Sequence, residues 1–437
     1  MAGQVGENGV KFNGSERFLN PDLRSWGHSG LKGVLQMPDT IYVLDLQVTG
    51  AAQVMVYDDA GIDSIVVNGI YDPPVEISLG WTLLNGRTMM AGAVYFGFDG
   101  KWHRFLVNGQ VEDASGSNGR DSVLGNEFSN HLMGDRSTAG AGGDDTLRGG
   151  SGNDLMQGGS GSDRVFGDAD NDRLYGNDGA DSLYGGTGAD TLEGGAGADE
   201  LSGGGSVGDT LSYAAATAGV QVYLTFGATT TARGGEAEGD QIDGFLNVIG
   251  SRLNDRITDT LGQTVAGGGN DNIFFGNGGR DKLVLGGGND AAYGGTDNDM
   301  VLGMLGNDSL FGGSGKDWIV GGYGQDILSG GAGADRFSFK SPADSSADPA
   351  LCDRITDFSS AERDRIDLRA FDADRSTVGN QAFTLIDGAF TGTAGELRLT
   401  VSGDDLLISA DVLGNGMPNF AVLVLNTTTL TEADFIL

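Results

Sequence analysis

Apolar residues recur every nine positions through two glycine-rich stretches of the chain. In each nine-residue unit, glycines precede an aspartate and an apolar residue follows two positions later, as in "GGSGNDLMQGGSGSDRVF" from Gly149 to Phe166. A helix would instead place apolar residues three or four positions apart. The short segment around each apolar residue has room only for a strand, so each unit predicts a tight turn followed by a short strand.

Two such units make one coil of 18 residues. Residues i and i+18 are therefore expected to stack at the spacing of neighbouring strands, about 4.8 Å. The apolar side chains should point inward and form a thin ladder, which in the first array consists of Leu147, Met156, Val165, Leu174, Leu183, Leu192 and Leu201. Upstream, Val123 and Leu132 keep the same phase before a six-residue insertion, as expected of degenerate end units.

The aspartates form two series that share this spacing. The first series is Asp145, Asp154, Asp163, Asp172, Asp181, Asp190 and Asp199, and the second is Asp271, Asp281, Asp290, Asp299, Asp308, Asp317, Asp326 and Asp335. Asp271 stands ten residues before its successor and so begins the second series irregularly. On an 18-residue coil, alternate aspartates line opposite sides of the roll.

Carboxylates stacked this closely cannot all stay ionised without a cation, because like charges in register repel. A hard divalent cation resolves the repulsion. Ca²⁺ takes about six to eight oxygens, which aspartates of successive coils and glycine carbonyls can supply, whereas Mg²⁺ demands a tighter octahedron and Zn²⁺ prefers nitrogen or sulfur. We therefore predict several bound Ca²⁺ ions, with all the aspartates of the two series as ligands.

Composition agrees with a cation-dependent fold. The chain of 437 residues has 79 glycines and a formal net charge of -35, and residues 1–110 carry 11 acidic and 7 basic residues, so about -31 falls on the rest. This charge argues against nucleic acid as a partner. A single cysteine, Cys352, excludes an intrachain disulfide and thiolate metal sites. No apolar run is long enough for a transmembrane segment, and the N-terminus lacks the features of a Sec signal peptide.

The run G-G-x-G-x-D-x-U-x resembles the calcium-binding nonapeptide of the RTX family, which folds as a parallel β-roll. The resemblance covers roughly residues 116–211 and 250–339. Departures occur where Asp168, Asp170 and Asp297 replace glycines and where Ala292 shortens the apolar ladder. Residues 211–257 resemble the strand-rich spacer found between nonapeptide blocks.

The segment after Asp335 is similar to the domain that follows the roll in serralysin-type proteases. Its acidic residues Asp353 and Asp357 are interpreted as solvated surface, with a further cation site as the alternative. The final "TEADFIL" resembles the uncleaved signal read by type I ABC exporters. The resemblance thus implies export in one step from a Gram-negative cell, with the type I secretion machinery as partner and an extracellular or cell-surface location.

The predicted fold class is all-β. We expect a small β-sandwich-like domain over residues 1–112, a first calcium-binding parallel β-roll over 113–211, a β-rich spacer over 212–249, a second roll over 250–339 and a β-rich C-terminal secretion domain over 340–437. The first of these rests on short apolar or alternating runs and on Asn-Gly turns at 68–69, 85–86 and 108–109.

No catalytic residues are predicted. Residues 1–112 are too short for a metalloprotease domain, and the three histidines form no H-E-x-x-H. The G-x-S-x-G match around Ser206 lies between repeat and spacer rather than between a strand and a helix. We interpret the chain as a non-catalytic calcium-binding protein with a matrix, adhesin or surface-layer role, whose front domain binds a surface glycan or another copy of the chain. The alternative is an extracellular hydrolase or lyase built on the front domain or on the groove of a roll.

Overall fold

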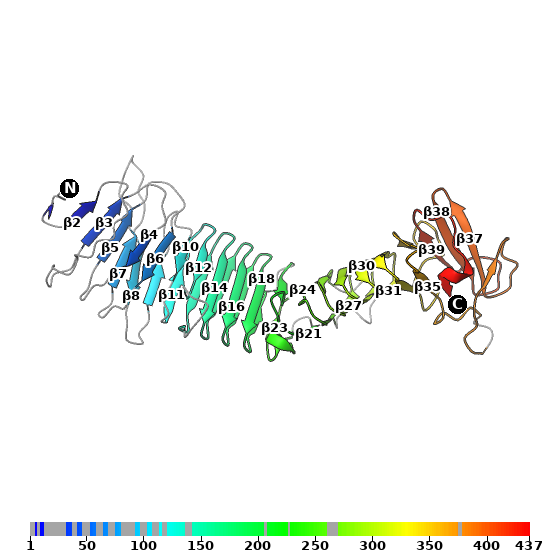
Figure 1. Cartoon of the computed structure of the whole chain (residues 1–437), viewed down its shortest axis with the longest axis horizontal. Helices are drawn as coiled ribbons and strands as arrows, with labels where there is room; N and C mark the ends of the chain where they lie inside the picture. Colours follow the sequence, from blue (N-terminus) through cyan, green and yellow to red (C-terminus); the bar gives the residue numbers. More distant parts are fainter. Residues whose placement is uncertain are drawn as a thin grey trace. The chain divides into compact units, whose positions relative to one another are not determined.

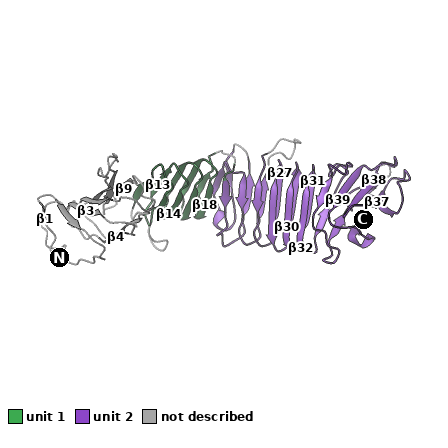
Figure 2. Cartoon of the chain, turned by 90° about the horizontal axis from the view of Figure 1, so that it is seen from above, with its two compact units in different colours: residues 1–209 green, residues 210–437 purple. Residues whose placement is uncertain are grey.

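The computed structural model describes residues 120–135, 142–204, 208–225, 228–259, 270–374 and 378–437, together with the backbone of the strands within residues 1–119. The chain divides into two compact units, Met1–Asp209 and Thr210–Leu437 (Figure 2). The described residues are almost all strand or turn and include two short 3-10 helices, η2 (Gly235–Ala237) and η3 (Glu432–Asp434). The predicted all-β fold is confirmed. No helix in the described part of the chain is long and apolar enough to cross a membrane.

The repeats of the first unit alternate between two parallel sheets (Figure 1). One sheet contains β11 (Asp121–Leu124), β13 (Thr146–Gly150), β15 (Arg164–Ala169), β17 (Ser182–Thr187) and β19 (Glu200–Ser202), and the other contains β12 (His131–Met133), β14 (Leu155–Ser160), β16 (Arg173–Asp178) and β18 (Thr191–Ala196). Val165 pairs with Leu147 on one side and with Leu183 on the other, so the predicted 18-residue coil is present. Residues 136–141, which fall in the predicted insertion, lie outside the described residues.

Ten further strands lie within residues 1–119. They are β1 (Val5–Gly6), β2 (Gly9–Phe12), β3 (Lys32–Gln36), β4 (Tyr42–Asp45), β5 (Gln53–Tyr57), β6 (Ser64–Asn68), β7 (Val75–Leu79), β8 (Gly92–Phe96), β9 (His103–Leu106) and β10 (Asp113–Ser115). Their connections and side chains lie outside the described residues, as do the predicted Asn-Gly turns apart from the backbone of Asn68 at the end of β6. The sandwich-like arrangement of residues 1–112 therefore stays a prediction.

The second unit begins with longer coils and continues as a roll. One sheet contains β20 (Thr210–Ser212), β24 (Asn247–Ile249), β26 (Ile273–Phe275), β28 (Ala291–Thr296), β30 (Ser309–Gly315), β32 (Ile327–Gly333) and β34 (Asp353–Ile355). The other contains β21 (Gln221–Leu224), β25 (Arg256–Asp259), β27 (Lys282–Gly287), β29 (Met300–Leu305), β31 (Trp318–Tyr323), β33 (Arg336–Ser338), β35 (Arg365–Asp367) and β40 (Phe435–Ile436). Leu211 pairs with Val248, so the predicted spacer forms one enlarged coil. Within this coil, β22 (Thr230–Thr231) and β23 (Gln241–Asp243) form a short antiparallel hairpin.

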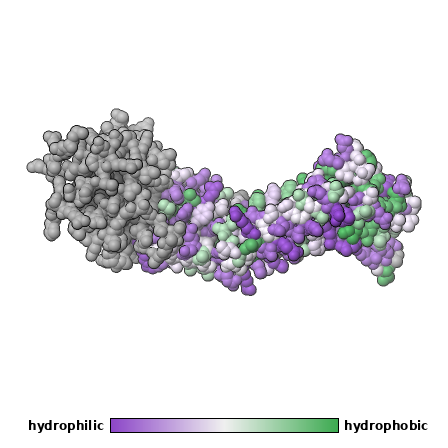
Figure 3. Space-filling view, viewed as in Figure 1, coloured by the Kyte–Doolittle hydropathy of each residue, from purple (hydrophilic) through white to green (hydrophobic). Residues whose placement is uncertain are grey.

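The last strands close the second roll with a mixed sheet that contains both parallel and antiparallel pairings. β36 (Thr384–Ile386) pairs with β37 (Glu396–Ser402), which continues into β38 (Asp405–Asp411) and β39 (Phe420–Val424). β39 also pairs with β34 of the roll, and Phe339, Phe371 and Phe420 pack edge-to-face beneath it. Much of the roll surface is hydrophilic, whereas hydrophobic residues gather on this C-terminal domain (Figure 3). Its exposed apolar side chains include Leu413 and Met417.

The core of both rolls is the predicted apolar ladder. In the first unit the inward residues from Val123 to Leu201 are at most 1% exposed, and in the second unit the inward residues, including Ala292, are fully buried. The turns between the strands require left-handed backbone. Asp168, Asp170 and Asp297 take φ values of 75°, 74° and 77°, so these aspartates adopt the conformation of the glycines that they replace.

Candidate calcium sites

The aspartates of each series form a hydrogen-bonded column. The backbone N–H of Asp145 donates to Oδ1 of Asp163 at 2.7 Å, and the same bond repeats from Asp163 to Asp181 at 2.7 Å. The opposite side of the first roll carries equivalent bonds from Asp154 through Asp172 to Asp190. In the second unit, one column runs through Asp281, Asp299, Asp317 and Asp335 and the other through Asp290, Asp308 and Asp326. One carboxylate oxygen of each such acceptor thus ties two coils together.

The second carboxylate oxygen is the unusual feature. Oδ2 is buried and has no hydrogen-bond partner at Asp145, Asp154, Asp163, Asp172, Asp181, Asp190, Asp281, Asp290, Asp299, Asp308, Asp317, Asp326, Asp335 and Asp353. Asp199 is equally buried, and its Oδ1 accepts the N–H of Asp181 at 2.9 Å. A buried polar atom without a partner costs about 1–3 kcal/mol, and more when it is charged. So many in register indicate a shared role in binding a ligand rather than a series of defects.

The first glycine of each unit lies beside that oxygen, at a position where a Cβ would be too close to it. A Cβ on Gly312 would lie 2.5 Å from Oδ2 of Asp317 and 2.7 Å from the carbonyl oxygen of Gly330. The space beside Gly185 is bounded in the same way, by Asp190 and Gly203. The same pair of oxygens, one carboxylate and one glycine carbonyl from the next coil, converges at Gly134, Gly149, Gly158, Gly167, Gly176, Gly185, Gly276, Gly294, Gly303 and Gly312.

These donors are all oxygen. Within the described residues, no three His, Cys, Asp or Glu side chains gather at one point, so backbone carbonyls must complete any coordination shell there. Hard cations with flexible shells accept that donor set, and Ca²⁺ binds oxygens at about 2.3–2.6 Å. The residues present therefore fit Ca²⁺, held by an aspartate and by the carbonyls of glycine turns.

Burial without a cation raises the pKa of these carboxyls. Loss of solvent is the largest cause, and neighbouring aspartates in the column add to it at most positions. The pKa rises to about 9 at Asp145, to about 8 at Asp181, Asp281 and Asp290, to about 7 at Asp154, Asp163, Asp172, Asp299, Asp308 and Asp335, and to about 6 at Asp317. A bound cation favours the ionised form and acts against this shift.

Asp271 stands apart from the other predicted ligands. It is exposed, and its Oδ1 accepts the N–H of Asn289 in a turn. The buried position in the column belongs to the next residue, Asn272, whose N–H donates to Oδ1 of Asp290 at 2.7 Å. The amide of Asn272 also donates to the carbonyl of Leu246. Asn272 stands nine residues before Asp281. The nine-residue spacing therefore identifies it as a member of the column, whereas a search for aspartate alone does not.

The columns of the second unit continue beyond the predicted aspartates. Asp326 donates its N–H to Oδ1 of Asp353, and Asp335 donates to Oδ1 of Asp364, both at 2.9 Å. The interpretation of Asp353 as solvated surface is therefore wrong, because this residue is fully buried as the next member of the column. Asp357 is half-buried and accepts the N–H groups of Gly330 and Gly331.

In the column that begins at Asp255, the two end aspartates form different hydrogen bonds from the interior ones. Asp255 donates its N–H to Oδ1 of Asp281, and its own Oδ2 accepts the N–H of Ser251 at 2.6 Å. At the other end, Oδ2 of Asp364 accepts the N–H of Ser359 at 2.8 Å. The end aspartates thus satisfy their second oxygen with a backbone donor, whereas the interior ones do not.

Comparison with known families agrees with this geometry. Residues 140–174 and 175–206 match the RTX calcium-binding nonapeptide repeat, in a family description of four copies, and residues 244–437 match the serralysin C terminal of peptidase M10. The chain carries RTX repeats. The predicted resemblance is confirmed, the RTX repeats are calcium-binding, and the C-terminal match supports a secreted, extracellular protein with a type I secretion signal.

Solved structures give weaker likenesses to this chain. Two are solution structures from the Azotobacter vinelandii mannuronan C5-epimerase. Its AlgE6R2 subunit shows 24% identity and a TM-score of 0.22 over 44% of this chain and 91% of that one. Its AlgE6R3 subunit shows 27% identity and a TM-score of 0.19 over 42% and 78%. The extracellular lipase LipA from Serratia marcescens shows 17% identity and a TM-score of 0.18 over 66% and 40%. No curated protein sequence matches the chain.

Proposed function

We propose that this RTX protein is non-catalytic, that its two rolls fold on calcium outside the cell, and that it serves a cell-surface, matrix or adhesive role. The observation that carries the proposal is the repeated meeting of an unpartnered carboxylate oxygen with a glycine carbonyl. The proposed ligands are the aspartates predicted from the sequence apart from Asp271, joined by Asp353. Ser206, the centre of the one nucleophile-like motif, lies outside the described residues.

Calcium can control folding because each site adds to the stability of the folded state alone. Extracellular calcium modules bind with dissociation constants of roughly 10⁻⁴ to 10⁻³ M, far above the calcium of a resting cytosol. At a calcium concentration about tenfold above the dissociation constant, one site contributes about 1.4 kcal/mol. About ten such sites equal the whole stability of a typical domain, roughly 5–15 kcal/mol. The rolls should therefore be unfolded before export and folded after it.

We assign the N-terminal and C-terminal regions the functions expected from the sequence. Residues 1–112 would recognise a surface glycan or another copy of the chain, and residues 340–437 would pass the chain to the type I exporter. The net charge of -35 supports the calcium-dependent part of this scheme, because the uncompensated acidic residues repel one another until cations bind.

The test is a calcium titration of the purified chain, starting from chelator and followed by far-UV circular dichroism and light scattering. We expect β signal to appear cooperatively with calcium and not with an equal concentration of magnesium. Scattering that then rises supports assembly as a surface or matrix protein, whereas a particle that stays monomeric argues against self-assembly. A β signal of full size in chelator contradicts calcium-controlled folding.

A further inference from the structure

One face of the second roll concentrates basic side chains in a strongly acidic chain. Consecutive strands from β25 to β35 place one residue each in a single outward column, in the order Arg256, Lys282, Met300, Trp318, Arg336 and Arg365. Neighbours in this column are one coil apart, about 4.8 Å. Four of the six are cations, and the two in the middle are large and apolar.

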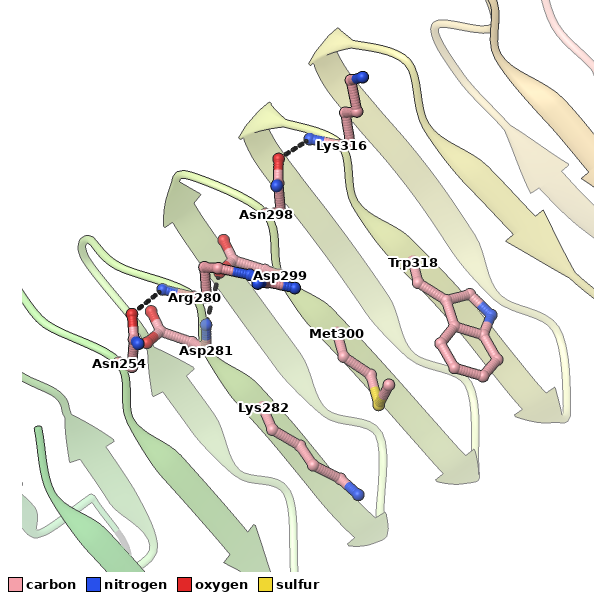
Figure 4. A pocket seen from close by; sticks show the side chains of 9 residues that line it. All are labelled: Asn254, Arg280, Asp281, Lys282, Asn298, Asp299, Met300, Lys316 and Trp318. Atoms are coloured by element: carbon pink, nitrogen blue, oxygen red, sulfur yellow. Dashed lines mark hydrogen bonds between the residues drawn. The ribbon is translucent and has the colours of Figure 1, made fainter.

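A groove runs beside this column where the turns meet the strands (Figure 4). It has a volume of about 420 Å³, and Lys282, Met300 and Trp318 line its strand side. Arg280 and Lys316 line its turn side, where both are exposed. Side chains of the preceding coils hold these turns, because Asn254 accepts the N–H of Arg280 at 2.7 Å and Asn298 accepts that of Lys316 at 2.8 Å.

Three cations of the groove have no counter-ion among the residues that the structure describes. Arg336 is paired with Asp367, but Arg280, Lys282 and Lys316 form no ion pair with any described residue. The carboxyls that line the groove, Asp281 and Asp299, are buried and direct one oxygen to the backbone of the neighbouring coil. An unpaired cation destabilises a fold only when it is desolvated. Arg280 and Lys316 are exposed and Lys282 is half-buried, so all three can reach an external anion.

Trp318 gives the groove a fixed apolar wall. Its indole N–H donates to Oγ of Ser338 at 2.7 Å, and the guanidinium of Arg336 lies 4.7 Å from the centre of its ring. The ring is only half-buried although it is held at both its nitrogen and its face. A rigid aromatic side chain flanked by Met300 and cations suits a ligand that has both apolar C–H faces and negative charges.

We infer that this groove binds an acidic polysaccharide whose carboxylates lie along the roll axis. A linear uronate polymer offers one carboxylate and one C–H face per sugar, and each sugar is about as long as one coil rise. Carboxylates would meet Arg280, Lys282 and Lys316, while a sugar face would pack on Trp318. The inference rests on the proposed function, because cations bound at Asp281 and Asp299 neutralise the carboxyls that line the groove and leave its charge positive.

Thermodynamic linkage requires that polysaccharide binding also affect calcium binding. A polysaccharide that binds better to the calcium-loaded roll must raise the calcium affinity of the roll by the same factor. The groove would therefore make attachment to an acidic matrix and calcium-dependent folding mutually supportive.

The test uses the full chain, first shown by circular dichroism to be folded in calcium. Fluorescence anisotropy of a labelled oligogalacturonate measures affinity, with a neutral maltooligosaccharide and poly-L-glutamate as comparison probes. The variant R280Q/K282Q/K316Q should bind the oligogalacturonate about tenfold more weakly, since each exposed ion pair contributes modestly. The matched variant R164Q/R173Q/R354Q removes the same charge from exposed positions elsewhere and should bind like the wild type.

Trp318→Leu should also weaken binding of the oligogalacturonate without changing the circular dichroism. The inference is overturned if the folded chain does not bind oligogalacturonate, if both triple variants lose affinity equally, or if poly-L-glutamate binds at least as tightly, which would indicate an acidic peptide instead. Failure of calcium-controlled folding is a separate result, because the first circular dichroism measurement detects it before any polysaccharide is added.

Discussion

Substitution of Gly312 by alanine tests one proposed calcium site, because it adds a single carbon atom, the Cβ, beside that site. Gly312 lies in β30 and does not have a positive φ, so its backbone conformation is open to alanine. In such a position, replacing glycine by alanine normally stabilises a protein by about 0.4–1 kcal/mol, because the unfolded chain loses freedom. The expected result here is the opposite.

The added Cβ would enter the space that we assign to a cation. It would lie 2.5 Å from Oδ2 of Asp317 and 2.7 Å from the carbonyl oxygen of Gly330, closer than real Cβ atoms approach such atoms. Loss of one cation at calcium about tenfold above the dissociation constant removes about 1.4 kcal/mol. After the gain from the unfolded chain, the free energy of unfolding should fall by about 0.4–1 kcal/mol, and further by the displacement of the two oxygens.

Two measurements on Gly312→Ala decide the matter. Isothermal calorimetry should find fewer calcium ions bound per chain, and urea unfolding in saturating calcium should show the lower free energy. Gly388→Ala is the matched control, because nothing lies within 4 Å of its Cβ position. It should retain the calcium stoichiometry and should not lose stability. If Gly312→Ala binds as many ions as the wild type and is equally or more stable, the space beside Gly312 is not a cation site.

Three other changes have expected outcomes. Asp308→Asn keeps an oxygen that accepts the N–H of Asp290 but removes the negative charge. Calorimetry should therefore find one bound calcium fewer, and urea unfolding at calcium about tenfold above the dissociation constant should show a free energy of unfolding lower by about 1.4 kcal/mol. An unchanged stoichiometry would exclude Asp308 as a ligand. In chelator, Asp163 and Asp172 have a pKa of about 7 in the folded state, compared with the usual 3.8 in the unfolded chain. The folded state therefore binds more protons than the unfolded state, and its stability falls as the pH rises from about 4 through 7. Acidification from about pH 8 to 5 should thus increase the β signal without calcium, and no change would count against burial of these carboxyls. Met304 has a φ of 87°, a left-handed conformation that costs a residue with a side chain about 1–2 kcal/mol. Met304→Gly should therefore raise the urea concentration at the unfolding midpoint without altering calcium binding. A lower midpoint would show that contacts of the Met304 side chain stabilise the fold by more than this backbone conformation costs.

The coil and its ladder could be predicted because one period controls both. The nine-residue step fixes which residues pair and which side chains point inward, and no local feature of the two arrays competes with it. Even Ala292, which shortens the ladder, stays in register because Phe274 and Leu310 hold the strands on either side. Aspartates at glycine positions, such as Asp297, were tolerated because a short polar side chain adopts left-handed backbone at low cost.

The ends of the columns could not be predicted from the period. Asp353 and Asp364 follow their predecessors by 27 and 29 residues, because the intervening chain leaves the roll before it returns. The sequence also does not show that the two oxygens of one carboxylate have different partners. That division depends on the direction of each side chain in the turn, which the residue pattern leaves open.

The two ends of the Asp255 column explain where the need for calcium comes from. Oδ1 of Asp255 accepts the N–H of Val220, and Oδ1 of Asp364 accepts the N–H of Asp335, so each binds one backbone N–H as the interior members do. Their second oxygens, however, accept the N–H groups of Ser251 and Ser359. An aspartate in this position therefore has no intrinsic need for a metal. The interior aspartates lack such a donor, because the neighbours of their second oxygen are a glycine and a glycine carbonyl of another coil. Each coil added between the ends brings more carboxylates without donors, so the calcium requirement should grow with the number of interior coils and not with the number of aspartates.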